Sequence, residues 1–312
     1  MYYEAHKKAA EFYKERISAE HVLLVYYHLK EAGNRREALT FLIDNIKYFW
    51  REGFWLEAKR VLRESLDLFD DKNVEGKIYS CLGSIVDDLG EWNKAIEYYT
   101  KSLKIKEELG DVHGMARTYN NLGLVYDRKG EWDKAIEYYT KSLKIKEELG
   151  DVHGMARTYG NLGSIYSNKR EWDKALEYYT KSLKISEELG DVHGMARTYG
   201  NLGSIYNSKG EWDKALEYYR KDLEISEELG DVHGMAVTKH NIANILRDTK
   251  EFDTALKLYT ESKKVYTDLG DIPNLMYLYY ALAEYYQNTN QEEKSKKCHQ
   301  KAEKLKNKLG IK

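Results

Sequence analysis

A tryptophan recurs every 40 residues through the middle of this 312-residue chain, at Trp92, Trp132, Trp172 and Trp212. The segments around these positions recur too, and residues 151–190 differ from residues 191–230 at only six positions. A period of this length is typical of solenoids and propellers, in which each unit buries its apolar face only against its neighbours. The sequence therefore predicts a tandem array rather than a fold with one central core.

Two helices fill each period. The first has apolar or small residues at the i, i+3, i+4, i+7 spacing of one helix face, at Tyr119, Leu122, Gly123 and Tyr126. A second such stripe begins at Trp132, and we expect this tryptophan to be a large core residue. Gly130 separates the helices, and Gly110 with Asp111 marks the repeat border, as a left-handed C-terminal glycine followed by an N-capping aspartate.

Composition narrows the classes of function. A net charge of −2 gives no attraction to nucleic acid or to an anionic membrane, and no apolar run approaches the roughly 18 residues of a membrane span. Two isolated cysteines, Cys81 and Cys298, argue against disulfides and thiolate metal sites. No signal-peptide pattern opens the chain. We therefore expect a cytoplasmic protein, and the sequence leaves its oligomeric state open.

The repeat resembles a known family at Leu122-Gly123, Tyr126, Ala135 and Tyr139, followed by a small residue, Ser142. This pattern is similar to the tetratricopeptide repeat (TPR), lengthened here from the usual 34 residues to 40. The resemblance, which is to repeats of the kinesin light chain and Pins/LGN type, implies an all-α, right-handed superhelix of antiparallel helix hairpins. We expect residues 53–312 to form this array, with a C-terminal capping helix, after an N-terminal helical region, a degenerate repeat, at residues 1–52.

The first 50 residues carry a second resemblance, in the segments 6–13, 27–33 and 38–42. They look like the helical stretch that follows the winged helix in archaeal and MalT-like STAND signal-transduction ATPases. No G-x-x-x-x-G-K-[ST] phosphate loop occurs in this chain. The resemblance therefore implies an alternative in which the chain is the ligand-sensor region of such an ATPase or transcription regulator. A consensus-like array without a natural partner is a third interpretation.

One set of candidate binding residues lies on the first helix of each repeat, opposite the core stripe. In the TPR family this side lines the concave groove. An amide can bond both an N–H and a C=O group of an extended peptide, and related repeat proteins use asparagines at this position in that way. The alternative is a structural tie between adjacent hairpins. The asparagines are Asn121, Asn161, Asn201 and Asn241.

Arginines form a second ladder on the same side. Arg117, Arg157 and Arg197 are spaced one repeat apart and would favour an acidic or phosphorylated segment, unless they pair with neighbouring carboxylates. We expect any acidic preference to be modest and centred on the repeats that begin at Asp151 and Asp191. The predicted peptide-binding set is completed by Leu124, Ser164, Ser204 and Asn244.

Two glycines near the asparagines need a reason, since glycine inside a helix costs about 1 kcal/mol. Either a ligand backbone or a neighbouring helix approaches Gly160 and Gly200, or one copy inherited its glycine from the other. The histidines at 113, 153, 193 and 233 each stand alone, so we expect no metal site, and no cofactor or catalytic constellation is indicated. The sequence thus predicts a non-enzymatic scaffold that binds an extended protein or peptide segment.

Overall fold

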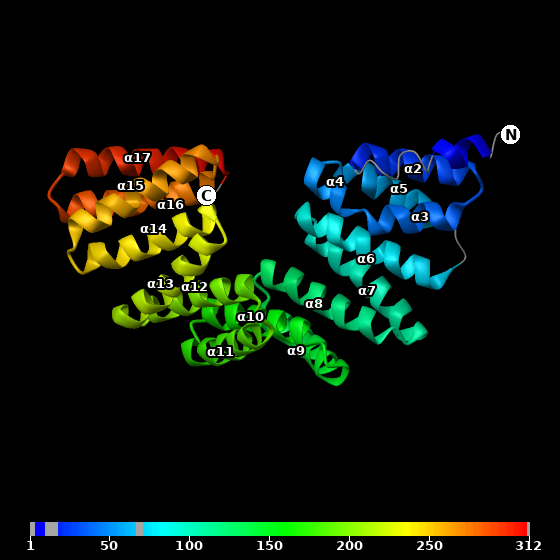
Figure 1. The fold of residues 1–312 in the computed structure, drawn as a ribbon, viewed down its shortest axis with the longest axis horizontal. Helices are drawn as coiled ribbons and strands as arrows, with labels where there is room; N and C mark the ends of the chain where they lie inside the picture. The colour runs from blue at the N-terminus through cyan, green and yellow to red at the C-terminus, as the bar shows by residue number, and fades with distance from the viewer. Residues whose placement is uncertain (1–3, 10–17, 67–70, 311–312) are drawn as a thin grey trace. The chain divides into compact units, whose positions relative to one another are not determined.

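The computed structural model describes residues 4–9, 18–66 and 71–310, without the side chains of residues 50–52, and each regular element in those ranges is a helix (Figure 1). Part of the N-terminal resemblance, at residues 10–13, lies outside the described residues. The chain divides into two compact units, residues 1–151 and 152–312, and each is described by itself.

Unit 1 contains the first helices of the chain. Within it α2 packs on α3, and α5 packs on α6. The pairs α6/α7 and α8/α9 are antiparallel hairpins joined through contacts between α7 and α8. The helices are α2 (Ala19–Glu31), α3 (Arg35–Asp44), α4 (Lys47–Glu52), α5 (Trp55–Leu66), α6 (Lys72–Asp88), α7 (Trp92–Leu109), α8 (Val112–Arg128) and α9 (Trp132–Leu149).

Unit 2 consists of four hairpins in succession, each second helix contacting the first helix of the next hairpin. The helices are α10 (Val152–Asn168), α11 (Trp172–Leu189), α12 (Val192–Ser208), α13 (Trp212–Glu228), α14 (Val232–Asp248), α15 (Phe252–Asp268), α16 (Ile272–Asn288) and α17 (Glu292–Lys308). The predicted all-α solenoid of helix hairpins is confirmed for the described residues. The boundary at residue 53 and the capping role of the last helix stay predictions.

The predicted helix borders are present. Gly110 ends α7 with a φ of 66°, a left-handed conformation that favours glycine. Asp111 then caps α8, its carboxylate accepting the backbone N–H of Gly114 at 2.9 Å. Gly130, between α8 and α9, has a φ of 73°. The ends of the helices in each hairpin are therefore determined by the local sequence.

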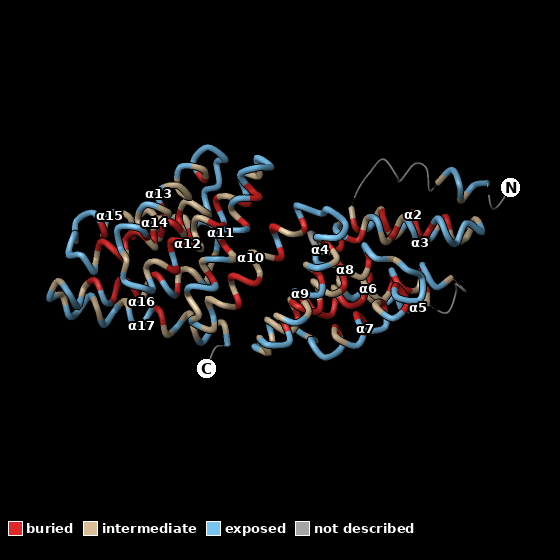
Figure 2. The backbone as a smooth tube through the Cα atoms, turned by 90° about the horizontal axis from the view of Figure 1, so that it is seen from below, coloured by how far each residue is buried: buried red, intermediate tan, exposed pale blue. Residues whose placement is uncertain are grey.

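A tyrosine seated on a glycine holds the two helices of a hairpin together. A Cβ atom on Gly123 would stand 2.7 Å from the ring of Tyr139, which is fully buried. Ser142, one turn further along α9, donates a hydrogen bond to the carbonyl of Ala116 at 2.7 Å. Small residues thus let the backbones approach, and buried residues line the inner faces of the hairpins (Figure 2).

The tryptophans are not the large core residues that the sequence indicated. Trp92 and Trp212 are 37% and 40% exposed, and Trp132 and Trp172 are half-buried. Each is the first residue of its helix, beside the turn where the facing helix has already ended. Replacing one by alanine should therefore cost less than the 3–5 kcal/mol of an emptied core site.

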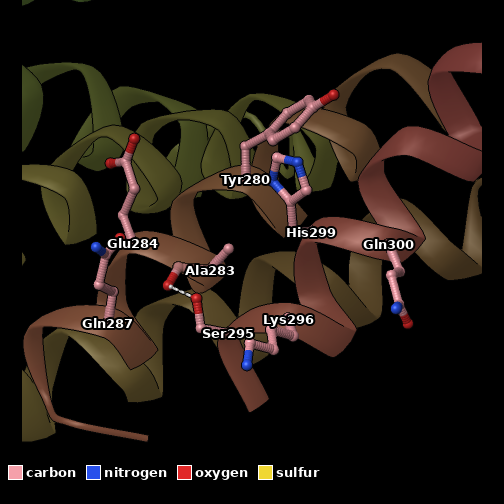
Figure 3. Close-up of a pocket in the computed structure, with 8 residues that line it drawn as sticks. All are labelled: Tyr280, Ala283, Glu284, Gln287, Ser295, Lys296, His299 and Gln300. Atoms are coloured by element: carbon pink, nitrogen blue, oxygen red, sulfur yellow. Dashed lines mark hydrogen bonds between the residues drawn. The ribbon is translucent and has the colours of Figure 1, made fainter. Parts of the chain in front are cut away.

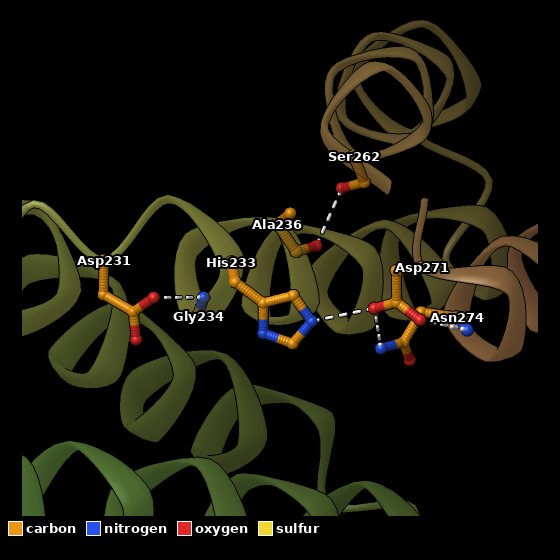
Figure 4. A network of polar contacts seen from close by, with 7 residues as sticks. All are labelled: Asp231, His233, Gly234, Ala236, Ser262, Asp271 and Asn274. Atoms are coloured by element: carbon orange, nitrogen blue, oxygen red, sulfur yellow. Dashed lines mark hydrogen bonds and ion pairs between the residues drawn. The ribbon is translucent and has the colours of Figure 1, made fainter. Parts of the chain in front are cut away.

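A polar network joins the third and fourth hairpins of unit 2 (Figure 4). His233 Nε2 lies 2.8 Å from Asp271 Oδ2, and Asp271 also caps α16 by accepting the Asn274 N–H at 3.1 Å. Burial raises the pKa of Asp271, but the hydrogen bonds from Asn274 and His233 outweigh it and leave that pKa below its usual value. The predicted solitary histidine thus bonds to the helix cap of the next repeat.

The glycine–tyrosine contact predicts opposite effects at two glycines of α10. Gly163→Ala should destabilise the protein by about 1–3 kcal/mol, because the new Cβ would lie 2.7 Å from the Tyr179 ring. Gly160→Ala should be neutral or stabilise by up to about 1 kcal/mol, since its Cβ would meet only Ser182 Oγ, at 3.6 Å. Urea unfolding measures both. Equal losses in the two variants would contradict this account of the hairpin.

The His233–Asp271 pair predicts a loss of stability in acid. A carboxyl group with a lowered pKa in the folded state stabilises the protein above its unfolded pKa, and the contribution disappears as pH falls through the lowered folded value. His233→Ala should cost about 0.5 kcal/mol at neutral pH and nothing once Asp271 is protonated. Unfolding curves across pH 2–7 measure this, with His193→Ala as the control because no bond from His193 to Asp231 is found.

Candidate functional site

The asparagine ladder lies on the first helices, α8 in unit 1 and α10, α12 and α14 in unit 2. All four side chains are half-buried. Among the described residues none of the four side-chain amides has a hydrogen-bond partner, so the structure provides no tie between hairpins at these positions. These residues are Asn121, Asn161, Asn201 and Asn241.

The arginine ladder is exposed. Arg117, Arg157 and Arg197 form no ion pair within 4.0 Å among the described residues. Arg128, at the C-terminal end of α8, about three helical turns after Arg117, behaves differently, because its guanidinium lies 2.7 Å from the buried carboxylate of Asp87. The three ladder arginines therefore keep their hydrogen-bonding capacity for a group from outside.

Other predicted groove residues have contacts within their own hairpins. Ser204 Oγ lies 3.1 Å from the Tyr219 hydroxyl, and Asn244 accepts a hydrogen bond from Tyr259 at 2.7 Å. Leu124 occupies the corresponding place in α8, 15 residues before Tyr139, whose buried hydroxyl has no partner. Ser164 is half-buried at the same place on α10. Ser204 and Asn244 therefore bond the tyrosine of the second helix, whereas Leu124 leaves the Tyr139 hydroxyl without a partner.

Side chains, and not backbone, lie nearest to the two glycines of the groove side. Beyond its own helix, a Cβ on Gly160 would meet only Ser182 Oγ, and one on Gly200 would lie 3.0 Å from the Asp222 carboxylate, which accepts a hydrogen bond from Thr238. No neighbouring helix backbone approaches either position. Of the reasons considered from the sequence, ligand approach and inheritance by duplication are left.

Unit 1 contains a cavity of about 380 Å³ on this side. It is bounded by the C-terminal end of α3 and by α6, α7 and α8. Two predicted site residues, Arg117 and Asn121, line it. The other lining residues are Ile43, Asp44, Lys77, Ser80, Cys81, Ser84, Lys106 and Asp111.

Lys106 is the unexpected member of this cavity. Its side chain projects from α7 and is only 6% exposed, and its ammonium donates to Ser80 Oγ and to Thr118 Oγ1, both at 2.7 Å. Burial, then the nearby charge of Arg117, lowers the pKa of Lys106 to about 8. Sequence reasoning missed this residue, although its spacing after Tyr99 and Ser102 places it on the core stripe of α7.

Unit 2 has a cavity of about 430 Å³ at the corresponding place of a later repeat. Asn241 and Asn244 line it, so it too includes predicted site residues. Tyr266 stands where Lys106 stands 160 residues earlier, and Tyr277 stands where Arg117 does. The same two positions of the repeat thus carry cations in the unit 1 cavity and tyrosines in this later cavity.

A further cavity, of about 480 Å³, lies between α16 and α17 (Figure 3). Tyr280 and His299 line it with their rings 5.5 Å apart, and Ser295 donates to the Ala283 carbonyl at 2.8 Å. In the preceding hairpin the equivalents of Ser295 and His299 are Ala255 and Tyr259, which are buried against the following hairpin. The polar replacements suit a face that meets water.

Within the described part of the chain, no group of three or more histidine, cysteine, aspartate or glutamate residues is placed to hold a metal ion. The helices there are also too polar or too short for any of them to cross a membrane.

Comparison with protein families identifies the repeat. A family model described as "Tetratricopeptide repeat" matches residues 74–148, 154–228 and 234–308, which together make up most of the chain. A search of curated protein sequences finds no match.

Several solved structures share the fold at low sequence identity. The apo form of RapI is 18% identical, with a TM-score of 0.71 over 88% of this chain and 99% of that one. The apo quorum sensor NprR from B. thuringiensis is 15% identical, with a TM-score of 0.63 over 97% and 99%. A STAND protein with a tetratricopeptide repeat sensor from Pyrococcus horikoshii is 17% identical, with a TM-score of 0.72 over 99% of this chain and 54% of that one. At these identities the likeness is one of fold alone.

The different partners of two buried tyrosines predict opposite effects of removing their hydroxyls. Tyr219→Phe should cost about 1 kcal/mol, because it removes the bond to Ser204. Tyr139→Phe should stabilise by about 1 kcal/mol, because it removes a buried hydroxyl without a partner. Amide hydrogen exchange in the two hairpins measures each effect locally. A loss of stability in Tyr139→Phe would show that its hydroxyl is bonded.

Proposed function

The chain belongs to the tetratricopeptide repeat family, and we propose that it is a non-enzymatic scaffold that binds an extended protein or peptide segment along the groove side of its first helices. The observation that carries this proposal is the set of four asparagine amides without internal partners. A half-buried amide with no bond inside the protein is available to the N–H and C=O groups of a peptide backbone.

In unit 2 the proposed contacts are Asn161, Asn201 and Asn241, on successive hairpins. Arg157 and Arg197 stand one helical turn before the first two of these asparagines and would bond carboxylate groups of the bound segment. Gly160 and Gly200 precede the same asparagines directly, so these two positions have no side chain of their own to keep a ligand backbone away. Ser164, Ser204 and Asn244 flank this line of residues.

In unit 1 the proposed contacts are Asn121 and Arg117, with Leu124 beside them as an apolar contact. Both polar residues line the cavity next to α3. The ligand would therefore place a side chain or an end group into that cavity. The cations of this cavity support a protein or peptide partner with acidic character. The net charge of −2 argues against nucleic acid or an anionic membrane as the partner.

A second candidate function is that of a sensor region for a small molecule. The STAND protein from Pyrococcus horikoshii is described as having a TPR sensor, and this chain spans 54% of it. The cavities of about 380 and 430 Å³ fall in the size range of small-molecule sites. A small molecule that raises the melting temperature, with no peptide bound by the groove, would favour this candidate.

Peptide display against the purified protein tests the scaffold proposal. Wild type should select peptides, and Asn161→Ala with Asn201→Ala should weaken their binding by about 30-fold, which corresponds to about 1 kcal/mol per amide. The melting temperature should stay within about 2 °C of wild type, because neither amide bonds inside the protein. Thr180→Ala, at an exposed position on α11, is the control for a surface change on a second helix.

Two outcomes would count against the proposal. Peptides that bind the double variant as tightly as wild type would remove the asparagine groove. A fall of several degrees in melting temperature with normal binding would make the asparagines structural ties.

A further inference from the structure

Lys106 is a buried cation without a carboxylate partner. It forms no ion pair within 4.0 Å among the described residues, although its side chain is 6% exposed. Burying a charge is costly unless an opposite charge and hydrogen bonds compensate for the lost hydration. The protein supplies the hydrogen bonds, and Asp111 attracts the ammonium without forming an ion pair with it within 4.0 Å.

The hydroxyl groups around Lys106 are oriented to accept its protons. Thr118 donates its own proton to the Gly114 carbonyl at 2.9 Å, so its oxygen accepts from Lys106. Ser102 donates to the Gly76 carbonyl at 2.7 Å, which leaves Ser80 to donate to Ser102 and to accept from Lys106. Two of the three ammonium protons are thereby used, and the third is available to the cavity that Lys106 lines.

The other charges of the cavity favour a single negative charge. Lys77 from α6 and Arg117 from α8 add two cations, while Asp44 from α3 and Asp111 before α8 add two carboxylates. Asp111 is already used as the cap of α8. The lining therefore has three positive and two negative groups, which suits a monoanion better than a doubly charged phosphate.

We propose that the cavity formed by α3, α6, α7 and α8 is a carboxylate-binding site, in which Lys106 and Arg117 hold an acidic group of the ligand and Lys77 adds a third positive charge. This inference rests on the proposed peptide-binding function and gives it a location. The acidic preference then belongs to helices α6, α7 and α8 rather than to the repeats that begin at Asp151 and Asp191. The ligand group can be an acidic side chain of a peptide or a free carboxylic acid.

The equivalent cavity in unit 2 differs from the unit 1 cavity in its charged residues. Val237, Tyr266 and Tyr277 replace Lys77, Lys106 and Arg117, so the three cations are absent at the same positions of the repeat. The backbone of the hairpin is therefore not what selects a carboxylate. The selection lies in these three side chains.

The lysine itself supplies a direct test. With ¹³C-labelled lysine in the full chain, the Lys106 signal should titrate near pH 8, and acetate should move the midpoint upward relative to chloride at equal ionic strength. Lys106→Met identifies the signal. An identical titration in acetate and in chloride would overturn the proposal.

Two short peptides distinguish the sources of the carboxylate. One is Ac-Ala-Ala-Glu-Ala-Ala-NH₂, and the other has Gln in place of Glu. A peptide ligand requires that the Glu peptide bind wild type at least about tenfold more tightly than the Gln peptide. Acetate binding without any preference for the Glu peptide supports the site with a free acid as its ligand. Binding of neither probe overturns the site.

Matched variants separate this site from general effects of charge. Lys106→Met should abolish the preference for Glu over Gln and should not unfold the protein, because it removes a buried charge. Lys146→Met removes a lysine that is also 6% exposed but does not line this cavity, so the preference should persist. A preference that survives Lys106→Met contradicts the proposal.

The two proposals can fail independently. Loss of display-selected peptides in the asparagine double variant, with no effect of Lys106→Met on the Glu preference, would retain the groove and reject the carboxylate site. A Lys106 response to acetate in a protein that selects no peptide would retain the site and reject the scaffold function.

Discussion

The contact between a glycine of the first helix and a tyrosine ring of the second is the interaction on which four of the hairpins, from α6/α7 to α12/α13, depend. Its geometry is the same at Gly83, Gly123, Gly163 and Gly203, where a Cβ atom would stand 2.7 Å from the ring. The tyrosine ring occupies the space that a side chain at the glycine of the first helix would need. The two helices therefore lie close enough for serines of the second helix, such as Ser142, to bond the backbone of the first. The groove side is then fixed, because it is the side of the first helix turned away from this contact.

Much of the fold could be predicted because its determinants are local and repeated. Gly110 and Asp111 set a helix border through backbone geometry and capping, and neither needs a distant partner. The stripe that includes Leu122 and Gly123 gave the core face correctly. The tryptophans were misjudged, because a helical stripe gives the direction of a side chain and not how far the facing helix extends.

The candidate site was predictable in part. The asparagine and arginine ladders follow from periodicity, and the structure places Arg117 and Asn121 together in one cavity. Lys106 was missed because a charged residue on a core stripe is normally read as solvated, and its burial depends on hydroxyls from two other helices. Periodicity also could not predict the hydrogen bond that Tyr259 donates to Asn244, since this bond depends on how two helices face each other.

The identity of the repeated contacts has a consequence for how the chain folds. Gly163 meets Tyr179 with the same geometry as Gly203 meets Tyr219, so either first helix would fit either second helix. Near-identical neighbours are prone to misassembly during folding, when a helix pairs with the wrong copy. Residues that differ between the copies can then favour the correct pairing. Asp222, where the previous copy has Ser182, accepts a hydrogen bond from Thr238 of the next hairpin at 2.6 Å. The polar residues that vary most between the repeats thus distinguish one repeat of this chain from the next.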